Sequence, residues 1–149
     1  MKKSLLIAAL VAAFSSTSAM AADTATINAT ANVLATCKFV KNQGTLAFGT
    51  LDGKSMANAT ATTTLSYECT NGTQSIVTLN NGVAFSDLKN ADQTSLIRYT
   101  LTTTGQNQVG QGFVGHELQY VVNANIAYDA YKDAKAGDHT DTIFVSIAE

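Results

Sequence analysis

The stretch that decides the fold runs from Asp23 to Thr36 and reads Asp-Thr-Ala-Thr-Ile-Asn-Ala-Thr-Ala-Asn-Val-Leu-Ala-Thr. Apolar and polar residues alternate along it, and only Leu34 breaks the alternation. Because successive side chains of a strand point to opposite faces, the pattern predicts one long strand with a single apolar face. The residues expected on that face are Ala25, Ile27, Ala29, Ala31, Val33 and Ala35. A strand this regular needs a sheet to join, and neither proline nor glycine interrupts its backbone.

The residues before this strand have the features of a signal peptide. Lys2 and Lys3 precede a short apolar run, and small residues at 19–21 fit a cleavage site. We expect cleavage after Ala21, with Ala22 as the alternative. The expected layout is a signal peptide at 1–21, an N-terminal extension at 22–36 and one domain at 37–149. We therefore expect an exported protein that enters the periplasm and does not insert into a membrane.

The rest of the chain has the composition of an all-β protein. Over the full 149 residues, 46% are hydrophobic and 13% charged, and the net charge of −2 gives no reason to expect a nucleic acid as partner. Short alternating runs between turn residues predict six or seven strands, which is typical of a β-sandwich. The expected strands after the extension lie at 45–48, 62–69, 75–79, 96–101, 117–128 and 142–148.

Cys37 and Cys69 are the two cysteines of the chain. An even cysteine count in an exported protein predicts a disulfide. Closing a loop of about 33 residues would stabilise the fold by roughly 3.5–4 kcal/mol on the chain-entropy estimate. The alternative of a metal or redox pair lacks a C-x-x-C motif and a nearby histidine.

The sequence contains no catalytic motif, so we expect neither an enzyme nor a bound cofactor. His116 and His139 are the only histidines, and neither belongs to a nucleophile-elbow or zinc-ligand pattern. Asp138, His139 and Asp141 could together bind a cation, but side chains that cap a turn are the favoured interpretation. Tyr67, Tyr99, Tyr120 and Tyr128 are expected in the core, whereas Tyr131 is expected in a loop.

Four motifs in a fixed order carry a family resemblance. They are Val33-Leu34-Ala35-Thr36-Cys37, Gly44-Thr45-Leu46-Ala47-Phe48-Gly49-Thr50, Tyr67-Glu68-Cys69-Thr70-Asn71-Gly72-Thr73 and Ala136-Gly137-Asp138-His139-Thr140-Asp141-Thr142. Together they resemble the spore coat protein U domain family, which includes the subunits of archaic chaperone–usher pili. The family often has tyrosine where His139 stands, so no aromatic role carries over to that position.

The resemblance implies an incomplete immunoglobulin-like sandwich that lacks its last strand. A periplasmic chaperone would first fill the open groove, and the N-terminal extension of a neighbouring subunit would replace it at an outer-membrane usher. Ala25, Ile27, Ala29, Ala31 and Val33 would form the donated face, within a donor segment at about 24–31. The expected partners are copies of the chain or other pilus subunits, and the expected role is adhesion or biofilm formation at the cell surface. The alternatives are a secreted coat or matrix protein and a monomeric periplasmic binding module.

Overall fold

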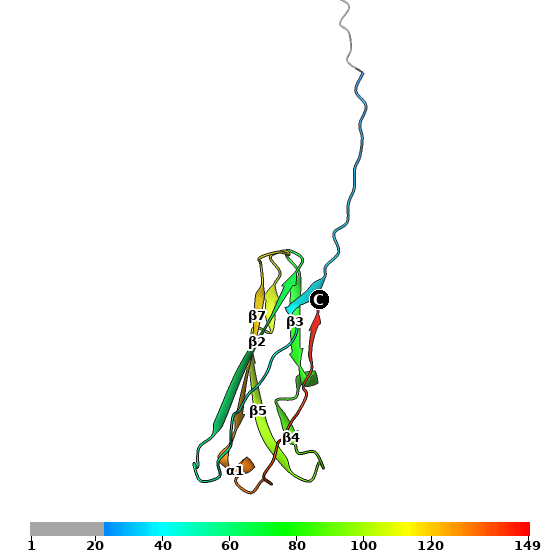
Figure 1. The fold of residues 1–149 in the computed structure, drawn as a ribbon. Coiled ribbons are helices and arrows are strands. Elements are labelled where there is room, and N and C mark those ends of the chain that lie inside the picture. Colours follow the sequence, from blue (N-terminus) through cyan, green and yellow to red (C-terminus); the bar gives the residue numbers. More distant parts are fainter. Residues whose placement is uncertain (1–22) are drawn as a thin grey trace, which may run out of the picture. The chain divides into compact units, whose positions relative to one another are not determined.

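The computed structural model describes residues 23–149, so the signal peptide expected at 1–21 lies outside the described residues. The described chain divides into two units at residue 32, and each is considered by itself. Residues 23–36 form no strand within the single chain, and Figure 1 draws them without an arrow. The alternating pattern fixes which face is apolar, but a strand also needs a neighbouring backbone, and no described strand pairs with this stretch.

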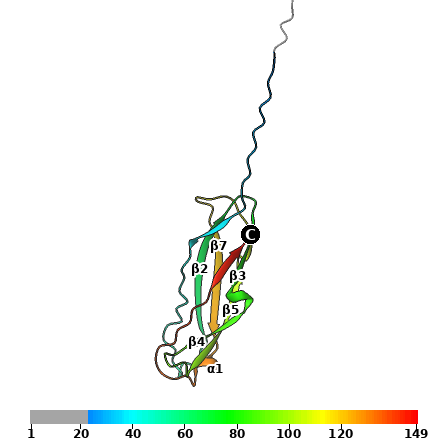
Figure 2. The ribbon, with the colours of Figure 1, turned by 90° about the vertical axis from the view of Figure 1, so that its right-hand side faces the viewer.

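The unit from residue 33 to residue 149 contains two antiparallel β-sheets. The larger sheet has the order β1 (Cys37–Lys41), β2 (Ala59–Cys69), β7 (Leu118–Ile126), β5 (Leu96–Thr104) and β4 (Phe85–Lys89). The smaller sheet has the order β6 (Asn107–Val109), β3 (Gln74–Leu79) and β8 (Val145–Ala148). Figures 1 and 2 show β3 and β8 side by side in a layer separate from β2 and β7. This confirms the predicted all-β fold, an immunoglobulin-like sandwich.

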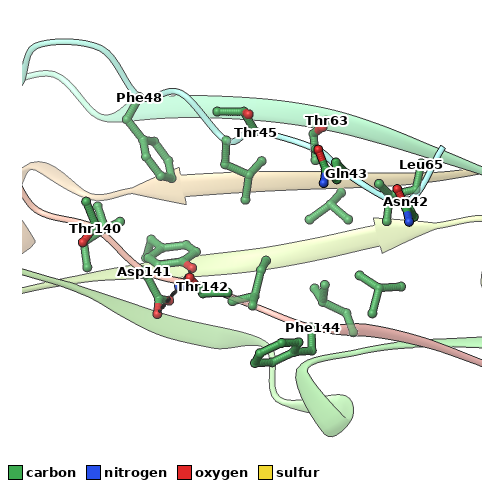
Figure 3. Close-up of a pocket in the computed structure, with 18 of the residues that line it drawn as sticks. Asn42, Gln43, Thr45, Phe48, Thr63, Leu65, Thr140, Asp141, Thr142 and Phe144 are labelled. Carbon is green, nitrogen blue, oxygen red and sulfur yellow. Dashed lines mark hydrogen bonds between the residues drawn. The ribbon is translucent and has the colours of Figure 1, made fainter.

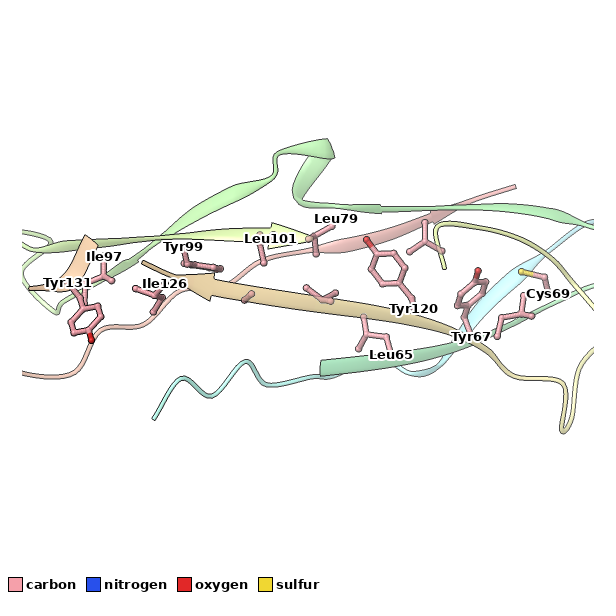
Figure 4. Close-up of a cluster of buried hydrophobic side chains, with 14 residues drawn as sticks. Leu65, Tyr67, Cys69, Leu79, Ile97, Tyr99, Leu101, Tyr120, Ile126 and Tyr131 are labelled. Carbon is pink, nitrogen blue, oxygen red and sulfur yellow. The ribbon is translucent and has the colours of Figure 1, made fainter. Parts of the chain in front are cut away.

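The core lies between the two sheets and is built by residues of one parity. Along β7 every second side chain is buried, from Leu118 to Ile126, and β5 alternates in the same way from Ile97 to Leu101. Figure 4 shows these side chains in one cluster with Leu65, Tyr67 and Leu79 of the neighbouring strands. The hydroxyl of Tyr67, which is fully buried, lies 3.0 Å from Ser75 Oγ, so its polar end has a partner.

One predicted strand is absent and three observed strands were not predicted. Residues 45–48 form no strand. The predicted alternation of side chains is nevertheless present, because Leu46 and Phe48 are half-buried and their neighbours are exposed. β4 was missed because Asp87 and Lys89 flank Leu88 and hide its pattern, and β1 was missed because lysines occupy two of its five positions. The third is β6, three residues long, which lies within a stretch predicted to be a loop.

The helical elements are short. The single-turn η1 (Asn80–Gly82) precedes β4, and α1 (Tyr128–Tyr131) follows β7. Tyr131 was predicted in a loop but lies at the end of α1, with its side chain buried. Its hydroxyl donates a 2.7 Å hydrogen bond to the Ala57 carbonyl. Tyr131 thus fixes the 52–58 loop against α1. None of the helices within residues 23–149 is long and apolar enough to cross a membrane.

The structure confirms the predicted disulfide between Cys37 and Cys69. The two residues stand directly opposite each other in the β1–β2 pairing, with their Cα atoms 4.1 Å apart. Cys69 is fully buried, and the pairing of β1 continues only to Lys41. The disulfide therefore fastens a short edge strand at the point where the chain enters the domain.

We predict that replacing both cysteines by alanine lowers the free energy of unfolding by about 2–4 kcal/mol, because the unfolded chain loses its cross-link. Urea denaturation of the exported protein and of the double variant measures this difference. Thiol labelling of the denatured wild-type protein should find no free cysteine. Two labelled thiols, or equal urea midpoints, would contradict the structural role of the disulfide.

Candidate functional site

A groove opens between two segments that belong to neither sheet. One wall is residues 42–50, which follow β1, and the other is residues 139–144, which lead into β8. Figure 3 shows Phe48 reaching into the space between these walls from one side, and Thr140, Asp141 and Thr142 on the opposite side. The groove consists of two hollows of about 680 and 730 Å³, which share lining residues on both walls. Those shared residues are Leu46, Phe48, Leu88, His139 and Thr140.

The floor of the groove is formed by side chains of the hydrophobic core that border the hollow. Leu65, Val122 and Tyr99 line it, and each of them is less than 9% exposed. Half-buried Leu46 and Phe48 on one wall and Ile143 and Val145 on the other bring further apolar surface to it. The space is thus shaped by hydrophobic side chains and closed by the protein on only part of its perimeter.

Two lengths of backbone along the groove lack a partner among the described residues. Residues 42–50 make no backbone or side-chain hydrogen bond within the described part of the chain. β8 pairs with β3 on one side, and no described strand pairs with its other side. Two lines of backbone donors and acceptors therefore face a gap in which a further strand could bond to both.

Tyr99 connects the two walls through the floor. Its ring packs edge-on against Phe48, with centroids 5.6 Å apart. Its hydroxyl donates a 2.7 Å hydrogen bond to the Asp141 carboxylate, which also accepts from Ser86 Oγ. Because β4 carries Ser86 and β5 carries Tyr99, Asp141 fastens the 139–144 wall to the larger sheet. The backbone pair between Lys89 and Thr140, at 2.9 Å in both directions, supports the same attachment.

This hydrogen-bond cluster shifts the ionisation of both partners. Burial by itself would raise the pKa of Asp141, but hydrogen bonds from Ser86, Tyr99 and the Thr142 backbone hold that pKa below its usual value. Burial, followed by the hydrogen bond to Asp141, raises the pKa of Tyr99 well above its usual value. Asp141 is therefore charged and Tyr99 neutral at physiological pH, as their hydrogen bond requires.

Of Asp138, His139 and Asp141, only His139 and Asp141 make hydrogen bonds within the described chain. His139 Nδ1 donates to the Gly137 carbonyl at 3.0 Å, and its Nε2 lies 3.0 Å from the Ser95 hydroxyl. Asp141 receives the Thr142 N–H at 2.8 Å in addition to the hydroxyls described above. No cluster of three potential metal ligands occurs among residues 23–149. His116 is exposed on another loop.

The residues expected on the donated face are all exposed, and they do not meet in a site within the described chain. Ile27 is 91% exposed and Val33 is 78% exposed, and the three alanines between and before them are exposed as well. On the groove side, Leu65 and Val145 line the hollow. Tyr120 does not line it, because its ring lies in the core with 1% exposure, where the sequence placed it. Sequence reasoning also missed Leu88 and the roles of Tyr99 and Asp141, which depend on contacts across the sheet.

We predict that Asp141→Asn loosens the 139–144 wall and destabilises the domain by about 1–2 kcal/mol, because hydroxyl hydrogen bonds to a charged acceptor are weakened. A carboxyl whose pKa is lowered by folding stabilises the fold above its unfolded pKa of about 3.9 and loses that contribution as the pH falls through the folded value. The wild-type protein should therefore lose stability more steeply below about pH 4 than the variant.

Asp138→Asn is the matched control, since Asp138 is exposed and makes no hydrogen bond among the described side chains. Thermal unfolding at a series of pH values separates the two variants. If Asp138→Asn and Asp141→Asn behave alike, the attachment of the wall does not depend on Asp141.

Comparison with known proteins assigns this chain to a protein family. A search among curated proteins found no match. The family model described as Spore Coat Protein U domain matches residues 23–146, nearly the whole of the described chain. Proteins of this family are exported structural subunits of chaperone–usher pili and coats, and enzymatic activity is not their role. An antiparallel sandwich with an open groove, a disulfide at its first strand and a matching family model together place this chain in the Spore Coat Protein U domain family.

Proposed function

We propose that this protein is a structural subunit of a surface pilus, and that it polymerises by donor-strand exchange. The N-terminal extension of one copy, centred on residues 24–31, would enter the groove of the next copy. The observation that carries the proposal is the groove itself, where unpaired residues 42–50 face the free side of β8 across a hydrophobic floor. A strand laid there would complete the sandwich.

The backbone supplies most of the expected affinity. The extension contains no proline or glycine between residues 23 and 36, so it can donate an N–H at every position. Both sides of the groove offer partners, and each backbone hydrogen bond contributes about 0.5–1.5 kcal/mol net. The unpaired wall and the donor segment are of similar length, so the bonds can extend along the whole wall.

The side chains of the extension suit this groove. Alanines at 25, 29 and 31 are small enough to lie over the floor, while Ile27 and Val33 can fill deeper hollows. Burial of each large side chain contributes about 1.5–3 kcal/mol. The larger part of the apolar floor lies in the 680 Å³ hollow, whose lining contains no Lys or Arg, whereas Lys132 and Lys135 line the other hollow. The uncharged strand therefore suits the first hollow best.

The open groove also explains why further partners are expected. Unpaired strand edges beside hydrophobic surface promote aggregation, so a newly exported subunit needs a temporary strand before it reaches its neighbour. We propose that a periplasmic chaperone supplies it and that an outer-membrane usher directs the exchange. Export by the signal peptide at 1–21 and a role in adhesion or biofilm formation belong to the same proposal. A monomeric binding module is less well supported, because it would leave the extension without a partner.

The first test places a charge on either face of the extension. Ile27→Asp would put a carboxylate into a hydrophobic hollow, which costs several kcal/mol unless the group protonates. The variant should fold and accept a strand but fail to donate one, so it should terminate filaments. Thr26→Asp adds the same charge on the opposite face and should leave filaments nearly normal. Electron microscopy of filament length compares the two, and equal filaments would argue against this donor face.

The second test concerns the groove. A copy of residues 22–35 fused to the C-terminus should fill the groove and raise the soluble yield of the subunit produced without a chaperone. The same fusion carrying the Ile27→Asp change should rescue much less, which controls for the added length. Abundant, cooperatively folded monomer from the unfused chain alone would contradict the open-groove account.

A further inference from the structure

The 110–117 loop places an exposed hydrophobic residue at one end of the domain. Val114 is 87% exposed, the most exposed large hydrophobic residue between residues 33 and 149. Its backbone has a φ of 66°, a left-handed conformation that β-branched residues rarely adopt. The Val114 side chain does not pack against the hydrophobic core of the described chain.

Buried groups hold this loop in a fixed position. The Gly115 N–H donates a 3.0 Å hydrogen bond to the carboxylate of Glu68, a residue that is only 4% exposed. Lys38 lies 3.8 Å from the same carboxylate, and its ammonium group sits 5.2 Å from the centre of the Phe113 ring. The Gly112 N–H bonds the Cys69 carbonyl at 3.0 Å, beside the disulfide. Val114 is therefore presented on a supported loop, which favours contact with a partner over free movement.

The same end of the domain is the point where the extension begins. The Thr70 side chain donates to the Leu34 carbonyl at 3.0 Å, and its N–H donates to Thr36 at 2.9 Å. Thr70 follows Cys69, so residues 34–36 and the base of the 110–117 loop flank the same turn. The loop also carries no charged residue between Gly105 and His116, which suits a contact with an uncharged surface.

These observations limit where a neighbouring copy can lie. With residues 24–31 in a neighbour's groove and Val33 at its near end, at most two residues lie between that strand and the anchored Leu34. Each residue spans at most about 3.6 Å, so the end of the neighbour's groove lies within about 10 Å of this turn. A second copy must therefore approach the end of the domain that carries the 110–117 loop.

We propose that Val114 is a docking contact for the body of a second copy of this chain, in addition to the strand that the two copies share. The inference rests on the proposed donor-strand exchange. The contact would restrict the angle between successive subunits and slow their separation. The contact is heterologous, because the loop of one copy meets a different surface of the next.

Val114→Asn tests this contact, because asparagine accepts the left-handed backbone but removes the apolar side chain. Val83→Asn is the matched control, since Val83 is also exposed and lies outside the strands, between η1 and β4. Two measurements are made on the full mature chain and both variants. One is the binding and thermal stabilisation by a free peptide of residues 22–35, and the other is the dissociation rate of assembled oligomers.

We expect Val114→Asn oligomers to dissociate about tenfold faster than wild-type oligomers, as loss of one buried valine contact implies. Peptide binding should be unchanged, because the peptide brings no neighbouring domain, and Val83→Asn should match the wild-type protein in both assays. Equal dissociation rates for Val114→Asn and wild type, or a lower melting temperature of the peptide-bound variant, would overturn the docking role. Failure of the peptide to bind the wild-type chain would instead overturn the proposed strand exchange and, with it, this inference.

Discussion

The groove depends on one unmet constraint: two facing lengths of backbone have no pairing partner within residues 23–149. Residues 42–50 and the outer side of β8 carry hydrogen-bonding groups that find no protein partner among the described residues. Buried or half-buried backbone groups normally pair, and sheet edges beside hydrophobic surface are normally protected. The features of the groove follow from this gap. Leu46 and Phe48 turn toward the core without belonging to a sheet, and Leu65 and Val122 end at an open space.

The walls keep their positions because side chains connect them to the sheets. The disulfide fixes β1, which leads into one wall, and Asp141 ties the other wall to Ser86 and Tyr99. Tyr99 also contacts Phe48, so a single floor residue touches both sides. A groove held in this way is largely preformed, which lowers the entropic cost of ordering an incoming strand. In the proposed exchange, the exposed extension would bear that cost instead, because it would become a strand when it binds.

Much of this architecture could be predicted from local patterns. The alternation in β2, β3, β5 and β7 identified the buried parity, and the cysteine count together with export identified the disulfide. The prediction failed where pairing decides the outcome. Residues 45–48 have a strand pattern but no strand, because alternation describes which side chains face inward and says nothing of whether a backbone partner exists. The strand expected at 23–36 would need the sheet of a neighbouring copy, so it stays a prediction. The same limit hid the site residues: Asp141, Tyr99 and Ser86 are far apart in sequence, and only the fold brings their side chains together.

Backbone hydrogen exchange, measured residue by residue on the monomeric and the assembled protein, tests the central claim most directly. The account predicts that the amides of residues 24–31 and of residues 42–50 exchange quickly in the monomer. Both stretches should become strongly protected together on assembly, because each supplies the other's missing hydrogen bonds. Assembly that leaves either stretch in fast exchange would contradict the claim that the groove is completed by the extension of a neighbour.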